Sequence, residues 1–160
     1  MVGMHESGMI AAKPNTYCYT AVINSCAHCE NDDIEKRDAL QIAVETYKEL
    51  IDSDYGGPNE VTFSTLISVL RNVLPACEKR SSAVANVLKK CAEDGHVGDA
   101  VVRRLQSTLS KDELRALLGD GVAADGKVDI EKLPAEWRRS IKVPAQRHRN
   151  GRSLSLSHLP

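Results

Sequence analysis

The segment Cys26-Ala27-His28-Cys29 brings two thiols and an imidazole close together, a spacing that could begin a metal site. A structural zinc ion needs four ligands, which usually come from two such pairs. No second pair at that spacing follows among the later cysteines and histidines. Cys26 also falls on the apolar face of an expected helix. We therefore expect a buried thiol at Cys26 and no metal or other cofactor.

Residues 120–131 have the length of a calcium-binding loop, but the chemistry of that loop is missing. Val122 and Ala124 stand where oxygen ligands are needed, and Asp125 replaces the glycine of the central turn. The chain also lacks a glycine-rich phosphate loop, a Ser/His/Asp set and a cluster of carboxylates. We expect a non-enzymatic protein without a small-molecule substrate.

The composition indicates a folded chain with two differently charged parts. Of its 160 residues, 42% are hydrophobic and 27% are charged, which is typical of globular proteins. No apolar run approaches the roughly 20 residues of a membrane helix, so no membrane partner is expected. Residues 1–131 hold 14 Lys/Arg and 21 Asp/Glu, a net charge of −7, whereas residues 132–152 hold seven basic residues and one acid, a net charge of +6. Such a basic segment can hold phosphates or can simply be a solvated tail.

The odd number of cysteines, five, indicates a reducing compartment.

One helical pattern occurs twice, and every member of the second set lies 44 positions after its partner. In each set, Pro-Asn is followed by apolar residues at i, i+3, i+4 and i+7, the spacing of one helix face. Asn15 and Asn59 suit the N-caps of these helices. The apolar positions are Tyr19, Val22, Ile23 and Cys26 in the first set and Phe63, Leu66, Ile67 and Leu70 in the second. A second helix is expected in each repeat, after polar inter-helix segments at 30–37 and 75–81.

We therefore predict an all-α fold, a helix-turn-helix repeat solenoid with C-terminal capping helices and a disordered tail. Ser110 and Glu113 form a capping-box pattern, and Gly119 is expected to end the helix that they begin. Residues 134–142 are predicted to form a last helix, with Trp137 docking back on the core. The expected parts are the end of a truncated preceding repeat (1–15), two repeats (16–59 and 60–99), capping helices (100–119), a loop with a short helix (120–142) and a disordered basic tail (143–160).

The repeats resemble those of the pentatricopeptide repeat family. The segments 61–67, Val-Thr-Phe-Ser-Thr-Leu-Ile, and 17–23, Tyr-Cys-Tyr-Thr-Ala-Val-Ile, are similar to the family's first helix. The family's second helix is matched by Ala43-Val44, Tyr47 and Leu50, and more loosely by Val87-Leu88 with Cys91. Pro58-Asn59 and Gly98-Asp99 are similar to the end of the family's repeat, although these repeats have 44 and 40 residues against roughly 35. The resemblance implies a protein that binds single-stranded RNA in a mitochondrion or chloroplast, for RNA processing, stability or translation. No targeting segment is visible in the first residues.

The resemblance also implies which residues contact RNA. Each base would meet one polar residue of a first helix and the residue that closes that repeat, with an apolar or aromatic side chain beside it. These residues are Thr20 with Asn59, Ser64 with Asp99, and Tyr17 and Val61 as the flanking surfaces. Asn59 and Asp99 could instead serve only as helix caps. Because the body is acidic, a protein-binding scaffold is the alternative function.

Overall fold

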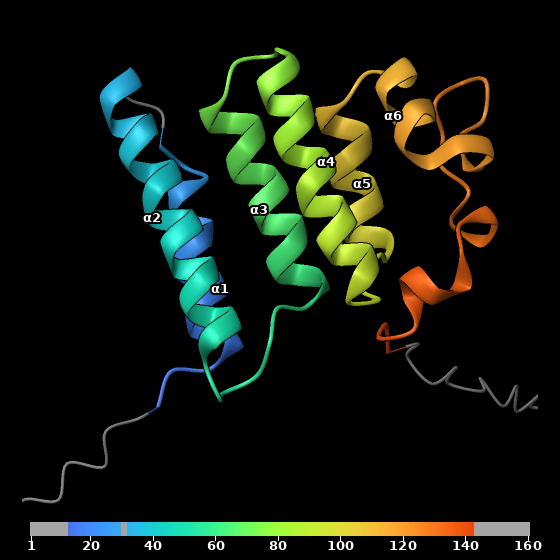
Figure 1. Ribbon diagram of the computed structural model, residues 1–160. Coiled ribbons are helices and arrows are strands. Elements are labelled where there is room, and N and C mark those ends of the chain that lie inside the picture. The colour runs from blue at the N-terminus through green and yellow to red at the C-terminus, as the bar shows by residue number, and fades with distance from the viewer. Residues whose placement is uncertain (1–12, 30–31, 143–160) are drawn as a thin grey trace, which may run out of the picture.

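The computed structural model describes residues 13–29 and 32–142, and the polypeptide in these ranges is all-helical (Figure 1). One isolated β-bridge joins Val122 to Val128, and the described residues contain no β-strand. The six α-helices are α1 (Thr16–Cys26), α2 (Asp33–Asp52), α3 (Glu60–Val73), α4 (Glu78–Glu93), α5 (Asp99–Thr108) and α6 (Lys111–Leu118), followed by 3-10 helices at Gly119–Gly121, Ile130–Lys132 and Ala135–Arg138.

The odd-numbered helices form one continuous series. Helix α1 packs against α3, and α3 packs against α5, while α2 lies against α1 and α3 and α4 lies against α3. Figure 1 shows the resulting row, with α2 in front of α1 at one end and α6 with the 3-10 helices at the other. Each of the two predicted repeats, 16–59 and 60–99, contains a pair of helices, α1 with α2 and α3 with α4.

Local capping explains where the helices begin. The Asn15 side chain accepts a hydrogen bond from the backbone N–H of Cys18, and the Asn59 side chain accepts one from Thr62. These bonds satisfy backbone donors that the first turn of a helix leaves without partners. Ser110 and Glu113 cap α6 reciprocally, and α6 ends at Gly119, whose φ is +59°. All of these predicted helix boundaries are confirmed.

Helix α3 lies at the centre of the core. Phe63 and Ile67 are fully buried in a single apolar cluster. The same cluster contains Ile23 of α1, Val84 of α4 and Leu105 of α5. Burial on several sides explains why the apolar residues of α3 form a nearly continuous run rather than a single stripe.

Two segments differ from the prediction. The expected polar segment at 30–37 is helical from Asp33 onward, because the Asp32 carboxylate accepts from the backbone N–H groups of Ile34 and Glu35 and so caps α2. The expected helix at 134–142 is a single 3-10 turn. The Trp137 carbonyl does not bond within a helix but accepts from the Val97 N–H at 2.8 Å. Trp137 does pack against the core, as predicted.

A side chain from α3 caps α5. The N-cap of α5 is Gly98, which has no side chain to offer, and the Glu60 carboxylate accepts instead from the Ala100 N–H at 2.8 Å. A Cβ atom on residue 98 would overlap that carboxylate, so glycine leaves the space that the contact needs. The first residue of α3 thus helps to fix where α5 begins.

Replacing Glu60 with alanine is expected to destabilise the protein by about 1 kcal/mol, because an N-cap bond contributes on that order. The free energy of unfolding from urea titrations measures the loss. Glu78→Ala is the matched control, since Glu78 is also the first residue of its helix and α4 shows no side-chain cap bond. Equal losses in the two variants would mean that the carboxylates act only on the dipoles of their own helices.

Candidate nucleic-acid interface

Thr20 lies on the side of α1 that faces α3. It is only 8% exposed, and its hydroxyl shares a 2.9 Å hydrogen bond with the hydroxyl of Thr62. The Thr62 hydroxyl also lies 3.2 Å from Asn59 Oδ1, within hydrogen-bond distance. The two residues predicted to share a base, Thr20 and Asn59, are therefore the ends of one hydrogen-bonded chain through Thr62.

This series of hydrogen bonds determines which atoms of the Asn59 side chain remain free to bind a ligand. Its Oδ1 accepts from both the backbone N–H and the hydroxyl of Thr62, at 3.1 and 3.2 Å. Those two bonds fix the orientation of the amide and occupy its oxygen. The Nδ2 group has no hydrogen-bond partner among the described residues, and Asn59 is exposed. Asn59 is thus a helix cap on one side and a free N–H donor on the other.

The second predicted pair is placed differently. Ser64 is 8% exposed, and its hydroxyl donates to the Val61 carbonyl at 3.0 Å. Asp99 is exposed and is the first residue of α5, one position after the N-cap Gly98. The interpretation of Asp99 as a helix cap is therefore wrong. Aligned by their helix caps, α3 and α5 place Gly98, rather than Asp99, at the position of Asn59.

The two predicted flanking residues are both accessible. Tyr17 is 80% exposed and Val61 is 56% exposed, and each is the second residue of its helix. They lie at equivalent positions at the starts of α1 and α3. An exposed ring and an exposed aliphatic side chain there could pack against bases.

A hollow of about 370 Å³ opens between α3 and α5, and its charged lining is entirely basic. Besides Ser64, it is lined by Arg71, Ala100, Arg103, Arg104 and Ser107. Within residues 13–29 and 32–142, no carboxylate forms an ion pair with any of these arginines. Arg103 donates to the backbone carbonyl of Asp99 at 3.2 Å, which leaves its other nitrogens available. Three unpaired guanidinium groups therefore border one open surface.

Sequence patterns did not predict this basic hollow. Ser64, Ser68 and Arg71 follow one another at i, i+4 and i+7, a polar stripe on an otherwise apolar helix, and this was the available signal. Arg103 and Arg104 belong to another helix. Their convergence with Arg71 depends on the packing of α5 against α3.

No protein-family model, curated protein or solved structure matches this chain. The likeness to pentatricopeptide repeats therefore rests on the residues of this chain alone. In the part of the chain that the structure describes, no helix is both long and apolar enough to cross a membrane.

Two of the five thiols, those of Cys26 and Cys91, are buried. Cys26 is buried, as predicted, and burial raises the pKa of its thiol. Burial, with a smaller contribution from the Asp94 carboxylate, raises the pKa of Cys91 to about 12. Both thiols are therefore neutral at physiological pH and weak nucleophiles. Among the described residues, no three Cys, His, Asp or Glu side chains are grouped to hold a metal ion.

Proposed function

We propose that this chain is a helical-repeat protein of the pentatricopeptide kind that binds single-stranded RNA along the series α1, α3 and α5. The observation that carries the proposal is the hollow lined by Arg71, Arg103 and Arg104, which no described carboxylate neutralises. Guanidinium groups match phosphate oxygens in geometry and charge. Proteins that bind single strands combine such a basic track with surfaces on which bases pack.

The predicted base-contacting residues lie near the starts of the same helices. Tyr17 and Val61 are exposed there, and Asn59 presents its free amide N–H groups beside Val61. A strand with phosphates on the arginines of α3 and α5 could turn its bases toward these residues. The repeat-solenoid architecture and a role in organellar RNA processing belong to the same proposal, because the resemblance implies both.

Fluorescence anisotropy with a labelled 12-nucleotide single strand, and with a duplex of the same sequence, tests the proposal. The full chain should bind the single strand and not the duplex. Each phosphate contact contributes about 0.7 to the salt slope for single strands, so three contacts predict a fall in affinity of about 20-fold between 50 and 200 mM salt. Absent binding, or equal binding of the duplex, would refute it.

Asn59→Asp should change base preference without unfolding the protein. Aspartate caps a helix about as well as asparagine, so the free energy of unfolding should stay within about 0.5 kcal/mol of the original. The exposed N–H donors, however, become a carboxylate oxygen, which cannot donate to a base acceptor. Anisotropy with four single strands that differ at one position measures the preference.

The matched variant is Asn59→Ala, which removes the cap and the donors together. We expect it to lose about 1 kcal/mol of stability as well as base discrimination. An aspartate variant with unchanged base preference would assign Asn59 to helix capping alone.

A further inference from the structure

Helices α1, α3 and α5 can be aligned by their N-caps, which are Asn15, Asn59 and Gly98. The third, seventh and tenth residues after the cap then form one stripe on each helix. In α3 and α5 all six of these residues are buried: Thr62, Leu66 and Val69, and Val101, Leu105 and Thr108. On α3 this stripe faces α1, since Thr62 bonds to Thr20 of α1.

The same stripe on α1 has no described neighbour. It consists of Cys18, Val22 and Ser25, of which Cys18 and Ser25 are exposed and Val22 is 45% exposed. Beside it, a hollow of about 320 Å³ lies between α1 and α2, and Ala39 and Ile42 of α2 contribute to its apolar lining. Ile42 is 48% exposed. An apolar surface of the kind that is buried twice elsewhere in the fold is thus open here.

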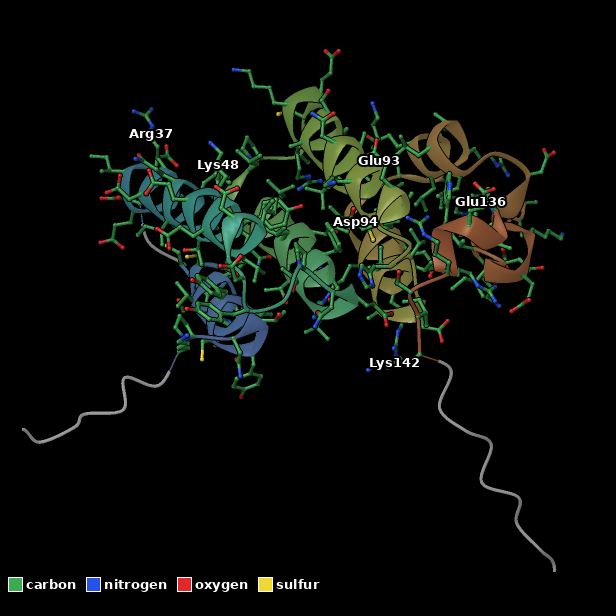
Figure 2. The ribbon with its side chains drawn as sticks, turned by 60° about the horizontal axis from the view of Figure 1, so that its bottom comes forward. Arg37, Lys48, Glu93, Asp94, Glu136 and Lys142 are labelled. Carbon is green, nitrogen blue, oxygen red and sulfur yellow. The ribbon has the colours of Figure 1, made fainter. Side chains whose placement is uncertain are left out.

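The border of this surface is acidic. Asp38, Glu45 and Glu49 are exposed on α2 and lie four residues before, three after and seven after Ile42, so they share its side of the helix. The basic residues of α2 lie elsewhere. At roughly 100° per residue, Lys36, Arg37 and Lys48 are about 120° or more away from Ile42. Figure 2 shows Arg37 and Lys48 along α2. We name the surface formed by Val22, Ser25, Asp38, Ile42, Glu45 and Glu49 the α1–α2 flank.

We propose that the α1–α2 flank binds an amphipathic helix whose apolar stripe is bordered by lysine or arginine. Helical form is inferred from the fold itself, which places a helix on the equivalent stripes of α3 and α5. Basic borders are inferred from the three carboxylates beside Ile42. A symmetric contact with a second copy would instead bring these carboxylates face to face, which is unfavourable. The proposal does not depend on RNA binding.

A synthetic 18-residue helical peptide with one leucine stripe between lysines is the probe, and the same peptide with glutamates in place of the lysines is its control. Binding to the full chain is followed by fluorescence anisotropy. The lysine peptide should bind, and the glutamate peptide should not. Ile42→Gln and the pair Asp38→Lys and Glu49→Lys should each weaken binding by about tenfold or more.

Ile51→Gln is the matched control on the protein. Ile51 is on the same helix and 44% exposed, but it lies nine residues from Ile42 and therefore on the opposite side. Its replacement should leave binding unchanged, and circular dichroism should show equal helicity in all variants. Absence of saturable binding, equal binding of both peptides or an equal loss in Ile51→Gln would overturn the proposal. A dimer in sedimentation velocity that Ile42→Gln dissociates would overturn it too, by identifying a second copy as the occupant.

Discussion

Replacing Arg71, Arg103 and Arg104 together with glutamine is expected to weaken single-stranded RNA binding by about 10- to 100-fold at 100 mM salt. The three guanidinium groups line one hollow and have no carboxylate partners among the described residues, so their charge is available to phosphates. The slope of log affinity against log salt should fall by about 2, since each lost contact removes roughly 0.7. Titrations by fluorescence anisotropy at several salt concentrations measure both quantities.

The control changes net charge equally at another place. Arg37, Lys48 and Lys79 are exposed, and no described carboxylate forms an ion pair with them. Their replacement with glutamine should reduce affinity by a factor of about 3 or less, because none of them lines the hollow and exposed charges away from a ligand are largely screened. If both triple variants lost affinity equally, RNA binding would be a property of overall charge, and the hollow would not be its site.

The largest effect on stability is expected for Phe63→Ala, a loss of about 3–5 kcal/mol in the free energy of unfolding. The Phe63 ring is fully buried at the centre of the fold. It lies 6.1 Å from the Tyr47 ring in an edge arrangement and 6.1 Å from the His96 ring, so its removal leaves a cavity between residues of several elements. Urea unfolding followed by circular dichroism measures the loss, which is a large share of a typical domain's stability.

Val61→Ala is the comparison, because Val61 belongs to the same helix and is 56% exposed. It should cost less than about 0.5 kcal/mol, as surface substitutions usually do. A loss below about 1 kcal/mol for Phe63→Ala would mean that the space around residue 63 collapses, and that α3 is not the rigid centre of the core.

The helix pairs could be predicted from sequence because their signals are local. An asparagine cap bonds to the N–H three residues later, and an apolar face repeats at three and four residues, so Asn59 and its helix are visible without knowledge of any neighbour. The start of α5 was less predictable. Its cap partner is the Glu60 carboxylate, 40 residues away, and an alignment by sequence placed Asp99 where the structure has Gly98.

The candidate site was only partly predictable for the same reason. Exposure of Tyr17 and Val61 fits their predicted role as flanking surfaces. The hydrogen bond between Thr20 and Thr62 joins residues 42 positions apart, and nothing in either local pattern indicates it. The basic hollow depends on α5 lying against α3, which brings Arg104 near Arg71. The residues that line this surface are therefore determined by the packing of α5 against α3, which local sequence patterns do not reveal.

The three arginines that border one hollow also affect the protein before any ligand arrives. Because like charges repel, we expect the three exposed guanidinium groups to repel one another across α3 and α5 in the empty protein. Dissolved ions reduce that repulsion by screening, and a bound polyanion reduces it by neutralisation. Salt would then act with opposite signs on two properties, raising the melting temperature of the empty protein while weakening its hold on RNA. The melting temperature at low ionic strength would therefore report whether the hollow is occupied.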